Sequence, residues 1–283
     1  MPEAPLGDFS GSIPGKNTLN YFRSVILDYY AAEGRNLAWR GTADFYHVLV
    51  SELMLQQTQV PRVEKKWNYF IQRFPNFKAV AAAPLQDLLD AWQGLGYNRR
   101  ALALKRISEE LSTPGSSLPE TIEELERFPM IGPATARSIS VFAFNKPELF
   151  IETNIRRVFI HFFFEGRTGV SDNEIMPIHK AALYREDPRK WYNALMDYGT
   201  HLAATTENAN TRSTKYSRQS RFSGSFRQLR GAVLKSLGAK GPARPEDIEV
   251  PEGFSYDDME ACLAVLEKEG FLVCEKNGIY RIR

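Results

Sequence analysis

Helical periodicity is the feature of this sequence that most restricts its fold. Apolar residues recur every three to four positions through most of the first 205 residues, and almost no stretch there alternates with period two. The pattern predicts a series of helices, at residues 19–30, 63–74, 85–92, 99–112 and 120–128, with two more between 175 and 204. We therefore expect an all-α body.

A carboxylate interrupts the apolar face of one predicted helix. This helix runs from about residue 44, contains the stretch SELMLQQTQV at residues 51–60, and carries on one stripe Phe45, Val48, Leu49, Glu52, Leu53 and Gln56. Burial disfavours the charged form of a carboxyl group, so we expect Glu52 to have a raised pKa and to donate a proton near neutral pH. The alternative is that Glu52 lies at the edge of the stripe and is solvated, because glutamate is seldom fully buried.

A second motif is a tight turn between two predicted helices, FPMIGPATA at residues 128–136. Gly132 lies in the turn and Pro133 at the first position of the next helix, as in a helix-hairpin-helix. The N–H groups of such a turn can bind a DNA phosphate. An ordinary αα-hairpin is the alternative, because such turns are common.

A second carboxylate, Glu152, begins another predicted helix in the stretch IETNIRRV at residues 151–158. Helix N–H groups and the helix dipole favour an ionised carboxylate at this place. Acidic residues are also common at helix starts without any chemical role. If both carboxylates are functional, a neutral Glu52 and an ionised Glu152 form a pair suited to breaking a glycosidic bond.

These stretches, together with LAWR at 37–40, GLGY at 94–97 and MDYG at 196–199, resemble the MutY adenine DNA glycosylases of the endonuclease III (helix-hairpin-helix) superfamily over roughly residues 35–205. The resemblance implies a two-lobed helix-hairpin-helix body. It implies catalytic roles for Glu52, which would protonate the departing base, and for Glu152, which would stabilise or attack the cationic sugar. It also implies DNA contacts by Gln56, Gln57, Thr58, Tyr97, Arg99, Met130, Gly132, Ala134 and Asn154, with Gln57 and Tyr97 wedged into the duplex.

The sequence departs from the family pattern at several of these positions. Glu152 stands where the family has aspartate, and the extra methylene moves the carboxylate by about 1.5 Å if the backbone is unchanged. Met130 replaces the first glycine of the hairpin, and Ala134 lacks the serine or tyrosine of adenine-specific members. Bifunctional relatives have a lysine at the position of Ala134, so we expect a monofunctional glycosylase without lyase activity.

The family's four iron–sulfur cysteines are also replaced. The matching positions hold Ala203, Asn210, Ser213 and Gln219, so we expect no 4Fe-4S cluster and no other metal. Residues 208–245, which begin in this region, hold nine basic groups and no acidic one. We expect this segment to contact the DNA backbone in place of the cluster loop. The alternative is a disordered basic linker.

The last part of the chain has a different pattern. Residues 226–237 and 257–269 are predicted helices, and two short apolar strands flank Asn277-Gly278, a strong hairpin signal. The order predicts a small winged-helix-like domain of α+β type. Residues 246–283 hold ten acidic and four basic groups, which favours docking or a few DNA contacts by Arg281 and Arg283. The family's Nudix-like C-terminal domain is not recognisable.

The expected organisation is therefore a disordered N-terminus at 1–16, a glycosylase domain at 17–207, a basic linker at 208–225 and the winged-helix-like domain at 226–283. The sequence has no run of 18 apolar residues and no signal peptide, so we expect an intracellular protein, cytoplasmic and nucleoid-associated or nuclear, without membrane contact. Two cysteines, Cys262 and Cys274, are too few for a disulfide framework.

The function expected from these residues and from the resemblance is that of a monomeric base-excision repair glycosylase. Its partner would be double-stranded DNA with a mismatched or damaged base, and its target adenine opposite guanine or 8-oxoguanine. Two alternatives stay open. One is a glycosylase for hypoxanthine, or for thymine or uracil in mismatches. The other is a non-catalytic, structure-specific DNA-binding protein on the same scaffold.

Overall fold

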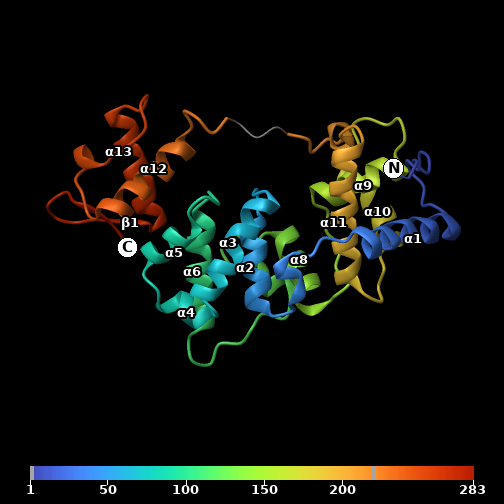
Figure 1. Cartoon of the computed structure of the whole chain (residues 1–283), viewed down its shortest axis with the longest axis horizontal. Helices are drawn as coiled ribbons and strands as arrows, with labels where there is room; N and C mark the ends of the chain where they lie inside the picture. Colours follow the sequence, from blue (N-terminus) through green and yellow to red (C-terminus); the bar gives the residue numbers. More distant parts are fainter. Residues whose placement is uncertain (1–2, 218–220) are drawn as a thin grey trace. The chain divides into compact units, whose positions relative to one another are not determined.

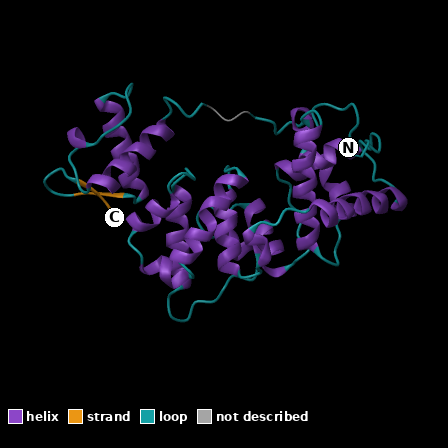
Figure 2. Ribbon diagram, viewed as in Figure 1, coloured by secondary structure: helices purple, strands orange, loops and turns teal. Residues whose placement is uncertain are grey.

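Helices make up nearly all the regular structure in this computed structural model, which describes residues 3–217 and 221–283 (Figures 1 and 2). Within those residues the only named strands, β1 (Leu272–Cys274) and β2 (Tyr280–Ile282), pair antiparallel near the C-terminus. The predicted fold class, an all-α body followed by a small α+β domain, is confirmed. No helix in the described ranges is long and apolar enough to cross a bilayer.

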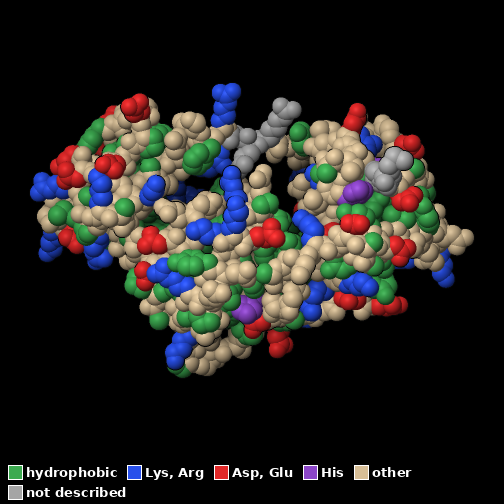
Figure 3. Space-filling model, in the orientation of Figure 1, with side chains coloured by type: hydrophobic (Ala, Val, Ile, Leu, Met, Phe, Trp, Pro, Cys, Tyr) green, Lys and Arg blue, Asp and Glu red, His purple; other side chains and the backbone are tan. Residues whose placement is uncertain are grey.

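The chain divides into two compact units, and each is described by itself. Unit 1 comprises Met1–Val48, Glu120–Glu126 and Ile131–Arg218, and unit 2 comprises Leu49–Pro119, Arg127–Met130 and Gln219–Arg283. Helix α2 (Phe45–Leu55) runs from the first unit into the second. Charged side chains of both signs are interspersed over the visible surface, in keeping with a net charge of +2 (Figure 3).

Unit 1 is a helical cluster around an aromatic core. Its elements are α1 (Lys16–Glu33), η1 (Ala38–Gly41), α7 (Ile122–Glu126), α8 (Pro133–Phe144), α9 (Thr153–Phe163), α10 (Asp172–Ala182), α11 (Pro188–Thr205) and η2 (Ala209–Arg212). Helix α9 packs against α10 and α11, and α1 covers α10 and α11. The Phe22 ring lies at the centre of this core, with ring centroids at 4.9–5.8 Å from those of Phe159, Phe162, Phe163 and Trp191.

The start of the chain differs from the sequence prediction. Composition predicted disorder at residues 1–16, but the described residues of this segment are bonded to the end of α9. The Leu6 N–H donates to the Phe162 carbonyl at 2.8 Å, and the Phe9 N–H to the Phe163 carbonyl at 2.9 Å. Helix α1 already begins at Lys16. Tertiary backbone bonds of this kind leave no trace in local composition.

Unit 2 combines a helical half with the C-terminal domain. The helical half holds α3 (Val60–Arg73), α4 (Phe77–Ala82), α5 (Leu85–Trp92) and α6 (Arg99–Leu111), with α4 and α5 packed on α6. The C-terminal domain holds α12 (Phe226–Lys240), η3 (Pro245–Asp247), α13 (Tyr256–Glu269) and the β1–β2 hairpin. Tyr280 of the hairpin also exchanges two backbone hydrogen bonds with Ala243, so the expected winged-helix-like arrangement has a third extended segment.

Candidate functional site

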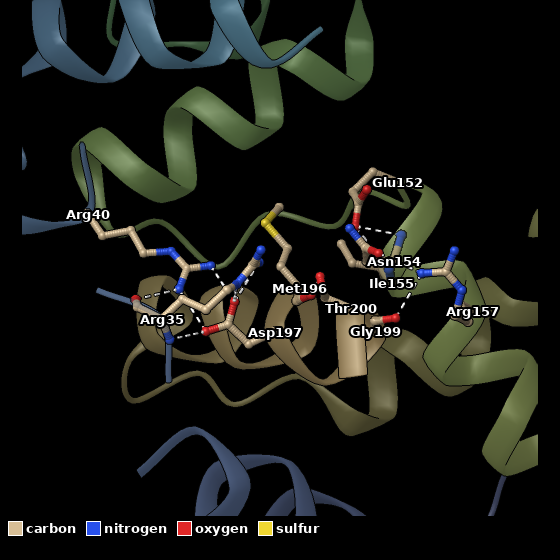
Figure 4. A network of polar contacts seen from close by, with 10 residues as sticks. All are labelled: Arg35, Arg40, Glu152, Asn154, Ile155, Arg157, Met196, Asp197, Gly199 and Thr200. Carbon is tan, nitrogen blue, oxygen red and sulfur yellow. Dashed lines mark hydrogen bonds and ion pairs between the residues drawn. The ribbon is translucent and has the colours of Figure 1, made fainter. Parts of the chain in front are cut away.

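Glu152 occupies the N-cap position of α9 in unit 1 (Figure 4). Its Oε1 accepts hydrogen bonds from the backbone N–H groups of Asn154, at 2.8 Å, and Ile155, at 3.0 Å. These are the donors that an N-cap residue satisfies. The longer side chain of glutamate therefore folds back to bond the first turn of its own helix.

The pKa of the Glu152 carboxyl is raised above its ordinary value. The side chain is only partly exposed, and its burial among protein atoms raises the pKa most. The N–H groups of Asn154 and Ile155 and the charges of Arg156 and Arg157 act in the opposite direction without cancelling that effect. The sequence expectation took account of the helix terminus alone, so the direction it gave for this group was wrong.

Asn154 is held by Arg157, a buried arginine of the same helix to which the sequence analysis gave no role. Arg157 Nη1 donates to Asn154 Oδ1 at 2.7 Å and to the Gly199 carbonyl of α11 at 2.8 Å. A Cβ on Gly199 would lie 2.6 Å from the Asn154 backbone oxygen, so only glycine allows α9 and α11 to approach this closely. The first turn of α9 thus has a well-defined place against α11.

Helix α11 is in turn held by Asp197, which is 2% exposed (Figure 4). Both carboxylate oxygens accept hydrogen bonds from Arg40, each at 2.8 Å, and Arg35 donates from its backbone and side chain at 2.8 and 2.7 Å. Burial opposes ionisation, but these two arginines lower the pKa of Asp197 overall. The network joins the LAWR stretch, which the sequence singled out as a loop, to the helix beside Glu152.

A hollow of about 200 Å³ lies beside the first turn of α9. Its lining includes Thr153, Arg156, Arg157, Asn210, Ser213 and Lys215, and none of the residues around it is acidic. Arg157 Nε and Asn210 Oδ1 are buried there without a hydrogen-bond partner among the described residues. The lining of the hollow therefore carries positive charge, of which Arg156 is already paired with Asp172.

Residues 208–217 can be compared with two predictions, a basic linker and the replacement of the iron–sulfur cysteines. Asn210 donates from Nδ2 to the Thr153 carbonyl at 3.0 Å, and the Thr214 N–H donates to the Val170 carbonyl at 3.0 Å, so the first part of the expected linker, residues 208–217, is bonded to other segments of unit 1. Asn210 and Ser213 present an amide and a hydroxyl where the family has thiolates, and these side chains do not suit an iron–sulfur cluster. Gln219, the fourth position, lies outside the described residues.

Glu52 lies in α2 and belongs to unit 2. The helix around it is buried on most sides, because Val50, Ser51, Leu53 and Met54 are each at most 2% exposed. Glu52 itself is partly exposed. The group is therefore an accessible carboxyl on a buried helix, and its role as a proton donor stays a prediction.

Arg100, which is 1% exposed, ties the end of α2 to the GLGY turn. Its Nη1 donates to the carbonyls of Leu53, Met54 and Gln56 at 2.6–2.8 Å, and its Nη2 to those of Leu95 and Gly96 at 3.0 and 2.8 Å. The Thr58 hydroxyl adds a bond to the Leu95 carbonyl at 3.3 Å. Two loops nearly forty residues apart are thus held together in unit 2.

Three of the expected DNA-contact residues have left-handed backbone conformations. The φ angles are 53° at Gln57, 49° at Tyr97 and 65° at Met130. Non-glycine residues seldom adopt this conformation, and those that do are concentrated at functional sites. Gln56 Nε2 donates to the Met130 carbonyl at 3.0 Å, and the Met130 side chain is 45% exposed. Met130 therefore keeps the backbone turn of the glycine it replaces.

The remaining expected contacts fall into two groups. Gly132 is the N-cap of α8, with Pro133 at its first position, and Gly132 and Ala134 are exposed at this helix start as the hairpin pattern predicts. Arg99 instead forms an ion pair with Glu269 of the C-terminal domain, although its side chain is 59% exposed. The DNA contact expected of Arg99 stays a prediction.

Sequence reasoning missed the residues that hold these groups, namely Arg100, Arg157, Gly199 and Arg227. A signal existed for Arg100, because it shares a helical stripe with Ala103, Leu104 and Ile107, where a charged residue needs a specific partner. Gly199 and Arg227 act through contacts with residues 45 and 130 positions away, which no local pattern reveals.

Part of the chain is similar to a known family of DNA repair proteins. Residues 50–177 match the profile of the HhH-GPD superfamily base excision DNA repair proteins. The chain is 38% identical over 135 residues to the adenine DNA glycosylase of Mycolicibacterium smegmatis, covering 47% of this chain and 46% of that protein. It is 34% identical over 181 residues to that of Mycobacterium tuberculosis, covering 62% and 59%. The chain spans about half the length of these relatives.

Solved structures extend the comparison to the fold. A thermostable thymine-DNA glycosylase superimposes with a TM-score of 0.58 at 20% identity, covering 68% of this chain and 91% of that one. At this identity the likeness concerns the fold. The predicted resemblance to the helix-hairpin-helix superfamily is supported separately, by the profile match of residues 50–177.

Proposed function

We propose, from the premise that residues 50–177 form a domain of the HhH-GPD superfamily of base excision DNA repair proteins, that this chain is a monofunctional DNA glycosylase. It would hydrolyse the N-glycosidic bond of a base extruded from double-stranded DNA. The target we propose is mispaired adenine, opposite guanine or 8-oxoguanine. The curated relatives named adenine DNA glycosylase support this choice of base.

The observation that carries the proposal is the loop arrangement in unit 2. Gln57, Tyr97 and Met130 come from three separate stretches, and each has a left-handed backbone. Hydrogen bonds from Arg100 and Gln56 hold these stretches in place. Strained conformations that the surrounding structure fixes in advance are typical of sites that engage a ligand. Side chains at such turns can enter a duplex and take the place of an extruded base.

The proposed chemistry uses the two glutamates in different roles. Glu52 would protonate N7 of adenine, which makes the base a better leaving group and contributes about 10²–10⁴-fold. As the bond from C1′ to N9 breaks, positive charge develops on the sugar, and Glu152 in its ionised form would stabilise it before water adds to C1′. With Ala134 in place of a lysine, no Schiff base with the sugar forms by that route, so the product is an intact abasic site.

The DNA backbone would be held by two features of unit 1. The exposed N-terminus of α8 at Gly132 presents N–H groups suited to a phosphate. The basic hollow beside α9, with Arg156, Arg157 and Lys215, would take the backbone contact that the cluster loop makes in relatives. We propose that the protein works as a monomer, without a cluster, in the compartment that holds the DNA.

The test is a set of labelled duplexes carrying A:8-oxoguanine, A:G, hypoxanthine:T, T:G and U:G, incubated with the purified chain. We expect strand cleavage at A:8-oxoguanine or A:G only after alkali, and its loss in Glu52→Gln. Cleavage without alkali would contradict the monofunctional mechanism. Excision of hypoxanthine, thymine or uracil alone would replace adenine as the target.

A second candidate function, structure-specific DNA binding without catalysis, is favoured by the geometry of Glu152. Its Oε1 is already bonded to two N–H groups of its own helix, and its pKa is raised, both of which reduce its capacity to stabilise a cation. Glu152→Asp separates the two functions. An active enzyme is expected to gain or keep excision with the family's residue, whereas a binding protein excises nothing in either form and retains its affinity for the duplex.

A further inference from the structure

Two exposed aromatic rings lie at the start of α12, in the most basic part of the chain. Phe222 is 61% exposed and Phe226 43% exposed. Arg221 and Arg227 are their neighbours in sequence, and residues 208–245 contain no acidic group. Exposed phenylalanine costs free energy in water, so two such rings close together in sequence indicate a contact surface.

The backbone that displays the rings is ordered by hydrogen bonds. The Ser225 N–H and hydroxyl both donate to the Phe222 carbonyl, at 3.1 and 2.6 Å. The Gly224 N–H donates to Gln228 Oε1 at 2.7 Å, and Gly224 has a φ of 73°. Residues 222–225 therefore form a defined turn that leads into α12, with one ring before it and the other in the first helical turn.

This surface is joined to the turn that carries Tyr97. Arg227 Nη1 donates to the Tyr97 hydroxyl at 2.6 Å, and the Arg227 guanidinium carbon lies 5.6 Å from the ring centroid. The Arg100 guanidinium carbon lies 5.5 Å from the same ring. Cations at this distance are attracted to an aromatic face. The first turn of α12 thus fixes the side chain of the residue expected to enter the duplex.

The C-terminal domain is also anchored to α6 next to this turn. Glu269 at the end of α13 pairs with Arg99 of α6 and with Arg230 of α12, the latter at 2.6 Å, and its carbonyl accepts from Arg106 at 2.6 Å. These bonds set α12 beside the Tyr97 turn within unit 2. The Glu269 carboxylate is therefore paired with two arginines.

We propose that Phe222, Phe226 and Arg227 form a second DNA-contact site, which extends the Tyr97 turn and stacks on an unpaired nucleobase of the bound duplex. This proposal rests on the proposed function, since it assumes that DNA is bound at Tyr97. The occupant follows from the chemistry: aromatic rings stack on the faces of all four bases, and the surrounding arginines complement phosphates. The C-terminal domain then contributes directly to DNA recognition, although most of its surface is acidic.

The experiment measures binding of the full chain to a duplex that carries 2-aminopurine opposite an abasic site. Stacking on an aromatic ring quenches 2-aminopurine, so the wild-type protein should lower its fluorescence. Phe222→Ala and Phe226→Ala should each weaken binding by roughly 5-fold or more and reduce the quenching. Phe226→Leu keeps an apolar side chain of similar size but no ring, and it should also lose quenching.

Tyr256→Ala provides the matched control. Tyr256 is an aromatic residue of the same domain, 53% exposed, in the first turn of α13 beside Asp257 and Asp258. Its removal should change affinity by less than about 2-fold, because an acidic surface does not attract the duplex. Arg227→Met should weaken binding and lower the slope of log affinity against log salt by about 1, whereas Arg227→Lys should restore the slope.

The outcomes separate the two proposals. Absence of duplex binding by the wild-type chain would contradict the proposed function itself. Normal affinity and quenching in a Phe222→Ala, Phe226→Ala double variant, with wild-type binding intact, would overturn the second contact site alone. Thermal unfolding of each variant shows whether it is folded, and Phe226→Leu decides the matter if an alanine variant is not.

Discussion

Arg100 in unit 2 and Arg157 in unit 1 are both buried arginines that hold candidate site residues in place, and they are bonded differently. Arg100 is 1% exposed, and five carbonyl oxygens within 3.0 Å surround its two terminal nitrogens. Arg157 is 9% exposed, uses one terminal nitrogen for Asn154 and Gly199, and leaves Nε without a partner. One cation is saturated by the backbone and the other is not.

The surroundings of the two arginines therefore differ in how fully hydrogen bonds compensate the buried charge. Burial lowers the pKa of Arg100 to about 10, which still leaves it charged at neutral pH, and the carbonyl dipoles replace the lost water. The loops that carry Gln57 and Tyr97 are thus held by hydrogen bonds from within the protein. Around Arg157 the backbone supplies fewer acceptors, and a hollow lies beside the first turn of α9.

The largest effect is expected from Arg100→Met. The substitution removes the buried donor that five backbone carbonyls share, which should cost about 4 kcal/mol or more of unfolding free energy. Urea denaturation measures it. Arg62→Met, at an exposed arginine of α3, is the control and should change stability by less than about 0.5 kcal/mol. Equal stability of the two variants would show that Arg100 does not hold the loops.

The approach of α9 to α11 gives the next largest effect. Gly199→Ala places a Cβ 2.6 Å from a backbone oxygen of Asn154, which cannot move aside easily, so we expect a loss of about 3 kcal/mol. The control is Gly231→Ala in α12, where a Cβ meets nothing within 4 Å. That change should stabilise the protein by up to about 1 kcal/mol, because alanine is the better helix former. A neutral Gly199→Ala would mean that the contact at Arg157 is not tightly fixed.

Arg157→Met should cost less stability, about 2 kcal/mol, because only two hydrogen bonds are lost and an unpartnered Nε is removed. Its sharper effect is on pH dependence. Arg157 lowers the pKa of Glu152, so its loss should raise that pKa further. If activity needs ionised Glu152, the fall in activity on acidification should then begin at a higher pH than in the wild type.

A pH–rate profile of single-turnover excision tests this prediction. Arg167→Met, which breaks an exposed ion pair with Glu174 in the same unit, should leave the acid limb in place. An unchanged profile in Arg157→Met would remove Arg157 from the control of Glu152.

The fold was largely predictable because its signals are local. Helix α5 has the bounds that its apolar pattern predicts, and Pro133 and Gly270 mark the start of α8 and the end of α13. The exceptions depend on tertiary contact. Helix α12 continues through Gly238 to Lys240, where close packing on Gln86 overrides the propensity of glycine to end a helix. Helix α4 was missed because its short Ala-rich sequence has a weak pattern.

The candidate site was predictable in its residues more than in its geometry. The position of Glu152 at a helix start follows from its sequence, because the first turn of α9 is local. The raised pKa does not, because it comes from burial by neighbours that are distant in sequence. The ion pair of Arg99 with Glu269 was also not predictable, because the two residues lie 170 positions apart in the sequence.

The smallest change in stability is expected at a third arginine arrangement, the partly exposed pairing of Arg99 and Arg230 with Glu269. Burial opposes ionisation of Glu269, but the two arginines lower its pKa to about 2, from an ordinary value of 4.5. A lowered folded-state pKa contributes stability that is present above about pH 4.5 and is lost as pH falls toward about 2.

Glu269→Gln should therefore be less stable than the wild type by about 1 kcal/mol at neutral pH, and the difference should vanish near pH 2. Urea denaturation from pH 2 to 7 measures it, with Glu275→Gln at an exposed ion pair as the control. A difference that persisted at pH 2 would mean that Glu269 holds the C-terminal domain by packing and that the charge of its carboxylate does not contribute.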